Sequence, residues 1–379
     1  MITTTKSISD FAERRATWLE LFFDLVFVVA VSTLSHLLSN NLTIRELVYF
    51  TFLFIPVWWI WMGFSYYSDQ FEKDSFVQRL AIFVSMFGVI ILANTIPGAM
   101  DAQIRNFVIT YVLLRILLIV LYVITWYQYP KARSLTMRYI VGFVVGALIW
   151  LISIFFSIKH HLVLWGLALF IEMATPVLAY LTAKNIPKQR SHMDERFGLF
   201  TLIVLGDTIV SVAIGIENVH WNFAGVIDCI AGFFCAISMW KLYFDYADDK
   251  VIHRALRGGK LLLFRSFIYG YSHFLIFFSI VVFGVGIVAG AEAANINNVT
   301  RFILFSSPVI YISGITLIQF AAGKYSNEIF ITRLIAIAII LIMYFAFNEF
   351  LMRYSLLFFA IIFAILSIKR KGAGLLISS

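Results

Sequence analysis

The chain has 379 residues, of which 61% are hydrophobic and only 13% are charged, and its mean hydropathy is +0.92. Soluble domains carry a charge on about a quarter of their residues, so this composition excludes a water-soluble globular protein. The net charge of +8 could suit a nucleic-acid-binding protein, but topology and anionic lipid headgroups explain it equally well. We therefore expect an integral membrane protein that contacts lipid and binds no nucleic acid.

Apolar segments recur along the chain at lengths near 20 residues, the length at which an α-helix crosses about 30 Å of hydrocarbon. Residues 1–17 are polar and lack the pattern of a cleaved signal peptide, so we expect a cytoplasmic N-terminal segment there. We predict an all-α, polytopic fold with about twelve transmembrane helices, near residues 18–39, 45–66, 79–97, 106–127, 137–157, 161–182, 197–216, 222–244, 265–290, 302–321, 330–348 and 350–368. Residues 369–379 would form a cytoplasmic tail.

The lysine and arginine residues between these segments indicate the orientation. With the N-terminus inside the cell, 22 of them fall on the cytoplasmic side and 5 on the opposite side. This is the positive-inside pattern. It predicts that both termini are cytoplasmic.

Two landmarks recur in the second half of the chain. Asp24 precedes Trp61 by 37 residues, and Asp207 precedes Trp240 by 33. Each tryptophan is followed by a tyrosine six residues later and by an aspartate eight residues later. The spacing predicts two six-helix repeats, residues 18–190 and 191–368. Because six is even, both repeats would cross the membrane in the same direction.

The first and seventh predicted helices carry carboxylates inside apolar segments. Glu20 and Asp24 lie one helical turn apart on one helix face, and Asp207 with Ser211 occupies the matching face of the other helix. A carboxylate at the centre of a bilayer costs roughly 2.5–3.5 kcal/mol or more, so these residues need compensation. We expect them to line an ion pathway above an apolar gate. The gate residues would be Phe27, Val31, Val210 and Ile214. Alternatively, Glu20 and Asp24 bond to Arg14, Arg15 or Arg196 as an interhelical clamp.

Further ionisable residues lie deep in other segments. Arg115 and Glu172 are both far from the ends of their helices, and mutual pairing would avoid two isolated buried charges. Such a pair could act as a structural clamp, or it could serve gating or proton relay. Arg196, Asp228 and His273 are further candidates for a relay or a clamp.

No nucleophile elbow, phosphate-binding loop or metal-ligand spacing occurs in the sequence. We therefore expect no enzymatic activity, no catalytic or metal site and no cofactor. The aromatic residues Trp58, Trp59, Trp61, Tyr66 and Tyr67 predict a belt at the membrane surface, or alternatively a platform for a cation or a lipid headgroup.

Three sequence blocks resemble those of the bacterial low temperature requirement protein A family. They are residues 18–28, from Trp18-Leu19-Glu20 onward, residues 194–207, which end in Leu205-Gly206-Asp207, and residues 240–245. The resemblance covers nearly the whole chain. It implies a multi-pass inner-membrane protein linked by name to growth in the cold, without a defined biochemical activity.

The first block also resembles the FSD-bearing first helix of the endolysosomal and bacterial potassium-channel family that is built from six-helix repeats. That resemblance implies an apolar pore constriction between equivalent helices. This sequence departs from the family pattern, because Phe23 and Gly206 stand where that family has serine. Trp18 and Thr201 stand where it has arginine.

These observations favour a cation channel or a proton-linked transporter with a path between the first and seventh helices. Its partners would be membrane lipid and small cations or protons, and a homo-oligomer is compatible with the sequence. A non-transporting protein that binds lipid or a partner and supports growth in the cold is the alternative.

Overall fold

The computed structural model describes residues 17–71, 75–101, 103–156, 158–182, 192–218, 223–247, 260–292, 297–323, 326–347 and 354–368. Every regular element within these residues is helical, as the all-α prediction requires. The α-helices are α1 (Trp18–Asn40), α2 (Ile44–Phe71), α3 (Phe76–Thr95), α4 (Ile104–Gln128), α5 (Arg133–Ser153), α6 (Ile158–Thr182), α7 (Met193–Asn218), α8 (Phe223–Tyr246), α10 (Lys260–Glu292), α11 (Asn298–Ala322), α12 (Asn327–Ala346) and α14 (Ser355–Ser367). Short 3-10 turns at Ile96–Gly98 and Pro130–Ala132 lie between α3 and α4 and between α4 and α5.

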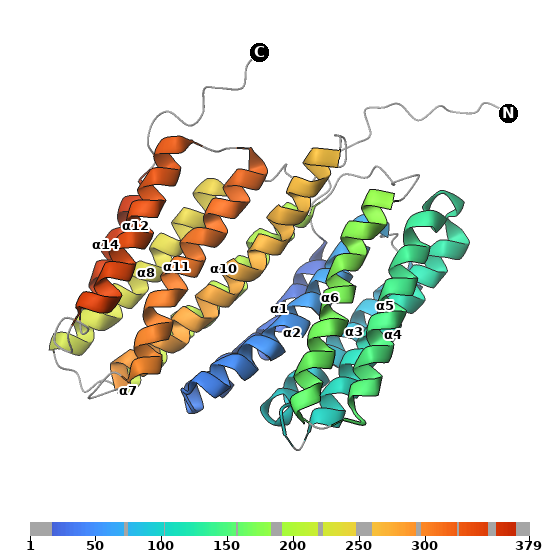
Figure 1. Cartoon of the computed structure of the whole chain (residues 1–379), viewed down its shortest axis with the longest axis horizontal. Helices are drawn as coiled ribbons and strands as arrows, with labels where there is room; N and C mark the ends of the chain where they lie inside the picture. The colour runs from blue at the N-terminus through green and yellow to red at the C-terminus, as the bar shows by residue number, and fades with distance from the viewer. Residues whose placement is uncertain are drawn as a thin grey trace, which may run out of the picture.

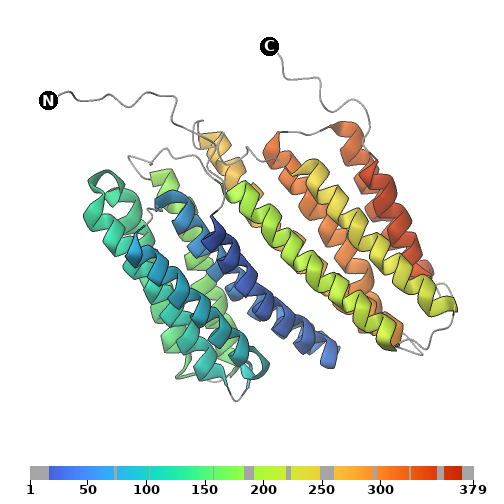
Figure 2. The ribbon, with the colours of Figure 1, turned by 180° about the vertical axis from the view of Figure 1, so that it is seen from behind.

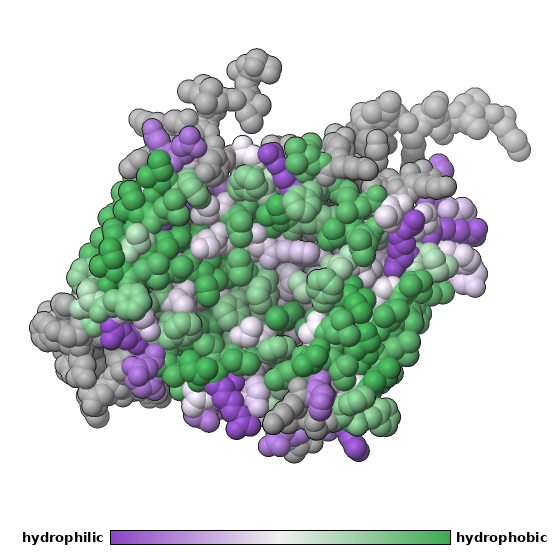
Figure 3. All heavy atoms as spheres, in the orientation of Figure 1, coloured by the Kyte–Doolittle hydropathy of each residue, from purple (hydrophilic) through white to green (hydrophobic). Residues whose placement is uncertain are grey.

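Ten helices in the described part of the chain are long and apolar enough to cross a membrane: α1 to α7, α10, α11 and α12. Ten of the twelve predicted spans fall on these helices, with close boundaries such as 18–39 against Trp18–Asn40, and the other two, 222–244 and 350–368, fall on α8 and α14. An apolar surface covers the middle of the molecule, and the strongly polar residues gather toward the ends of the helices (Figure 3). These helices and this surface are those of a multi-pass membrane protein. The number of crossings and their orientation stay predictions.

The helices form two groups that lie side by side, α1 to α6 and α7 to α14 (Figure 1). In the first group α1 packs on α2 and α3, α3 on α4, α4 on α5, and α5 on α6. The second group follows a similar order from α7 to α12, since α7 packs on α8 and α10, α10 on α11, and α11 on α12, but α14 packs mainly on α8 and only slightly on α12. This shared packing order is what a duplication would produce, although the duplication itself stays a prediction.

The two groups meet along α1, α7 and α10. Helix α1 packs on both α7 and α10, and α2 and α6 add smaller contacts with the second group. From behind, α1 runs next to α7 (Figure 2). Helix α10 has 33 residues, about 50 Å at 1.5 Å per residue, which exceeds the thickness of the hydrocarbon layer. A long helix of this kind fits a bilayer by tilting, and α10 crosses the molecule at a slant relative to α4 and α5 (Figure 1).

The aromatic residues of α2 form part of the core. The side chains of Trp58, Trp59 and Trp61 are at most 2% exposed, and Tyr67 is 3% exposed. The predicted belt at the membrane surface is therefore wrong for these residues. Helix α2 is surrounded by α1, α4, α6, α7 and α10, so its aromatic side chains pack between helices.

Small residues allow the closest helix contacts in the first group. A Cβ atom added to Gly146 of α5 would lie 2.4 Å from Cγ of Glu172 on α6. Glu172 is held by a hydrogen bond and an ion pair, so it cannot easily move aside. A Cβ atom added to Gly166 of α6 would have no neighbouring atom within 4 Å.

We expect Gly146→Val to lower the free energy of unfolding by roughly 1–3 kcal/mol, because overpacking forces the two helices apart. Gly166→Val is the matched control, with the same change of residue in open space. Thermal unfolding of both purified variants in detergent checks the prediction. Equal melting temperatures for the two variants would contradict the tight α5–α6 packing.

Candidate functional site

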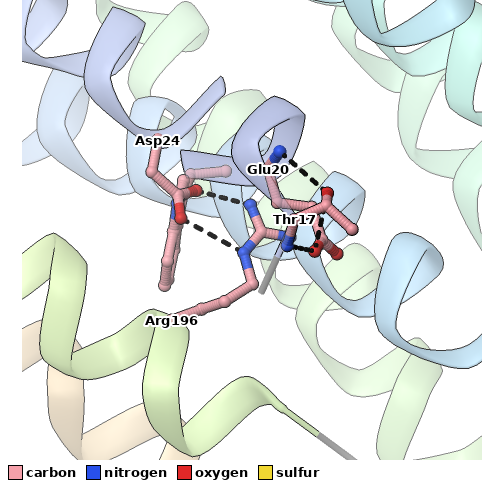
Figure 4. Close-up of polar contacts among 5 residues, drawn as sticks. Thr17, Glu20, Asp24 and Arg196 are labelled. Carbon is pink, nitrogen blue, oxygen red and sulfur yellow. Dashed lines mark hydrogen bonds and ion pairs between the residues drawn. The ribbon is translucent and has the colours of Figure 1, made fainter. Parts of the chain in front are cut away.

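A short polar contact between the two groups joins Asp24 of α1 to Arg196 of α7. Arg196 Nη2 lies 2.5 Å from Asp24 Oδ1, and Arg196 Nε donates to Asp24 Oδ2 at 3.2 Å. Trp61 of α2 donates its indole N–H to Asp24 Oδ1 at 2.7 Å. Figure 4 shows the Arg196 side chain reaching from its own helix to the carboxylate of Asp24. These three residues are the first polar layer, and each is at most 1% exposed.

This geometry compensates the buried charges. A carboxylate in hydrocarbon costs roughly 2.5–3.5 kcal/mol or more, and a paired guanidinium that binds both oxygens reduces that penalty. The Phe23 ring also lies 5.6 Å from the Arg196 guanidinium carbon, within cation–π range. Asp24 therefore forms the interhelical clamp that was the alternative prediction, and Arg196 is the arginine that pairs with it.

Glu20 caps the first turn of α1. Its Oε2 accepts the backbone N–H of Thr17 at 2.8 Å, and its own backbone N–H donates to the Thr17 hydroxyl at 3.3 Å. This reciprocal arrangement is a capping box, which satisfies N–H groups that the helix leaves without partners. The carboxylate of Glu20 thus has a local role at the start of the helix.

An apolar layer follows the first polar layer along α1. Phe27 and Val31 are 0% and 2% exposed, and the Phe27 ring lies 6.3 Å from that of Phe200 on α7. Phe200 in turn packs on Trp61 at 4.4 Å and on Phe277 of α10 at 4.8 Å between ring centroids. These side chains separate the first polar layer from the next polar residues of the interface.

Asp207 of α7 lies in a second polar layer. Ser32 of α1 donates its hydroxyl to Asp207 Oδ1 at 2.6 Å, and Ser211 donates to the Asp207 carbonyl at 3.1 Å. Asp207 is 9% exposed. Ser32 follows Asp24 by eight residues, which places the two layers about 12 Å apart along α1. Asp24 and Asp207 therefore lie at different depths and do not face each other as one acidic mouth.

Helix α10 closes one side of this interface. Thr208 donates its hydroxyl to the carbonyl of Ile280 at 3.2 Å. A Cβ atom on Gly284 would lie 3.3 Å from the Thr208 backbone, so glycine permits this close approach. His273 stacks on Phe197 with 4.0 Å between ring centroids and is hydrogen-bonded to the Tyr243 hydroxyl at 2.9 Å. His273 thus borders the first polar layer from the second group.

A separate charged cluster lies inside the first group. Arg115 Nη2 lies 2.9 Å from Glu172 Oε2, and both side chains are at most 1% exposed. The Tyr111 hydroxyl bridges them, since it donates to Glu172 at 2.6 Å and accepts from Arg115 at 2.8 Å. The Arg115 guanidinium carbon also lies 5.8 Å from the Trp59 ring. The cluster ties α4 to α6, away from the α1–α7 interface.

The remaining predicted residues are placed as follows. Val210 is 54% exposed on the outer surface of the chain, so within one chain it does not join Phe27 and Val31 in the apolar layer. Ile214 and Asp228 lie on α7 and α8, but their side chains fall outside the described residues. The described residues hold no cluster of three or more histidine, cysteine, aspartate or glutamate side chains that could bind a metal.

Two residues of the first and second polar layers were absent from the predicted pathway, Trp61 and Ser32. Trp61 had a usable signal, because Trp61 and Trp240 recur at similar distances after Asp24 and Asp207. Ser32 had none, since it lies off the predicted face of α1. Arg196 precedes Asp207 by 11 residues, about three helical turns, so both share a face of α7.

Comparison with known proteins gives a family and a distant relative. The family model described as "Bacterial low temperature requirement A protein (LtrA)" matches residues 15–368. The chain is also similar to "Uncharacterized protein RA0937" of Rhizobium meliloti (strain 1021), at 25% identity over an alignment of 286 residues that covers 72% of this chain and 69% of that protein. No solved structure matches the chain.

The Trp61 indole provides a direct test of the first polar layer. Trp61→Phe keeps an aromatic ring but removes the hydrogen bond to Asp24, and bonds to charged groups contribute about 1.5–3 kcal/mol. Trp58→Phe is the matched control, because Trp58 is 1% exposed on the same helix and its indole nitrogen has no partner among the described residues. We expect Trp61→Phe to lower the free energy of unfolding by about 1.5–3 kcal/mol more than Trp58→Phe does. Equal losses in thermal unfolding would refute the Trp61–Asp24 contact.

Proposed function

The chain belongs to the bacterial low temperature requirement A family, and from this premise we propose that it carries protons or small cations across the membrane along the α1–α7 interface. The observation that supports this most is the order of the layers at that interface. Polar residues lie on both sides of an apolar layer inside a structure that is otherwise packed with hydrophobic side chains.

The second polar layer supplies the binding group. Asp207 carries a carboxylate that is bonded by the neutral hydroxyl of Ser32, with no basic side chain paired to it among the described residues. A carboxylate and hydroxyl groups can exchange a proton or coordinate a small cation. Ionisable residues inside membrane helices commonly mark such pathways, because their burial is otherwise unfavourable.

The apolar layer supplies the barrier. Phe27, Val31 and Phe200 would exclude water, and hydrophobic constrictions gate conduction by this means. Arg196 would hold the path closed, since it occupies both oxygens of the Asp24 carboxylate that a cation would otherwise reach. Transport would then require the first polar layer to separate. From the positive-inside pattern we expect this layer on the cytoplasmic side of the membrane.

One observation favours the alternative of a non-transporting membrane protein. The rings of Phe23 and Phe200 pack against the first polar layer, on Arg196 and Trp61, so the layer resembles a structural joint between two packed groups. In that case the protein would bind lipid or a partner protein and support growth in the cold, as the family name suggests.

Flux into reconstituted vesicles separates the two functions. We expect the wild-type chain to carry protons or alkali cations faster than empty liposomes do. Asp207→Asn should reduce that flux about tenfold or more, because it removes the charge that binds the proton or cation. A contact to a charged group contributes about 1.5–3 kcal/mol, and about 1.4 kcal/mol corresponds to a factor of ten.

Two valine variants localise the path. Val31→Ala should raise the flux by thinning the apolar layer, whereas Val210→Ala, the same change on the outer surface of α7, should leave it unchanged. Wild-type flux no greater than that of empty liposomes would refute transport. Equal effects of the two alanine variants would place the path elsewhere.

A further inference from the structure

A pocket lies between α8, α12 and α14, in the second group of helices. Its cavity volume is about 200 Å³, and its lining residues are Tyr246, Ile329, Thr332, Arg333, Ile365, Leu366 and Ile368. It lies where α8 and α14 end and α12 begins, at the end of the molecule from which α1 starts (Figures 1 and 2). It is separate from the α1–α7 interface.

Arg333 carries the positive charge in this pocket. Its side chain is 2% exposed, Nη1 donates to the Thr316 hydroxyl at 3.2 Å, and the guanidinium carbon lies 4.9 Å from the Tyr246 ring. Nη2 is buried without a hydrogen-bond partner, and no carboxylate pairs with Arg333 in the part of the chain that the structure describes. A buried guanidinium keeps its charge, so the pocket has an unused donor for an anion.

Three other arginines of the described residues that have buried side-chain atoms reach a carboxylate or a backbone carbonyl. Arg196 and Arg115 pair with Asp24 and Glu172, and Arg301 donates to the carbonyl of Phe347 at 2.9 Å at the end of α12. Arg333 has only a hydroxyl and an aromatic face. A buried charge left in this state is unfavourable, and an anionic ligand would compensate it.

The walls of the pocket indicate what kind of anion fits. Ile365 and Ile368 of α14 are 56% and 67% exposed on the outer apolar surface, so the pocket opens toward the lipid. Ile329 and Leu366 complete an apolar lining around the guanidinium. A ligand with a charged head and an apolar tail matches both features, whereas a free inorganic anion would meet mainly apolar walls. Basic pockets between transmembrane helices commonly bind anionic headgroups.

We propose that this pocket binds the phosphodiester headgroup of an anionic phospholipid, with Arg333 as the headgroup ligand. The first acyl carbons lie along Ile365 and Ile368. The site is independent of ion transport through the α1–α7 interface and holds whether or not the chain carries ions.

Native mass spectrometry of the full chain in detergent tests the site. The probes are phosphatidylglycerol, zwitterionic phosphatidylethanolamine and inorganic phosphate. We expect phosphatidylglycerol to bind in preference to phosphatidylethanolamine, and Arg333→Gln to weaken it roughly fivefold or more, the effect of one basic side chain at an anionic headgroup. Arg133→Gln is the matched control, because it removes the same charge from an exposed position at the same end of the molecule.

A second variant tests the site in case Arg333→Gln fails to fold. Thr332→Phe keeps Arg333 but places a ring in the pocket, and it should also weaken phosphatidylglycerol binding. Unchanged phosphatidylglycerol binding in both pocket variants would overturn the proposal. Equal binding of phosphatidylethanolamine, or displacement of the lipid by inorganic phosphate, would also overturn it.

Discussion

The contact between Asp24 and Arg196 is the constraint on which the arrangement of the two helix groups depends. Each side chain alone would be a buried charge in a hydrocarbon environment, and together with the Trp61 indole they form a compensated unit. The unit draws its members from α1, α2 and α7. It therefore fixes how the second group of helices lies against the first, in a region where apolar packing alone distinguishes poorly between one register and another.

The same principle explains the other buried charges. Arg115 and Glu172 pair within the first group, with Tyr111 between them, and Glu20 is used by the start of its own helix. Asp207 differs, because a serine hydroxyl bonds to it and no arginine of the described residues pairs with it. That difference is why we assign the binding group of the proposed path to Asp207 and the closing contact to Asp24.

Much of the fold could be predicted from the sequence, because a helix that crosses a membrane needs a continuous apolar segment of fixed length. The boundaries of α1 follow from this rule. The unfavourable burial of Arg115 and Glu172 likewise indicates that they meet. The partner of Asp24 could not be predicted, because Arg14 and Arg15 precede the first predicted helix in the sequence and Arg196 precedes the seventh, so all three were candidates. Only the α1–α7 register shows that Arg196 is the partner. Val210 was misplaced for a similar reason, since the face of α7 that packs inward is decided by α10 as well as α1.

The most direct test of the Asp24–Arg196 contact is a double-mutant cycle on unfolding in detergent, with Asp24→Asn, Arg196→Gln and the double variant. Removing one member of a buried ion pair typically destabilises by about 3–5 kcal/mol, while removing both leaves no isolated charge. We expect the double variant to be more stable than Arg196→Gln alone. If the two losses simply add, Asp24 and Arg196 do not compensate each other, and the packing of the two helix groups must rest on something else.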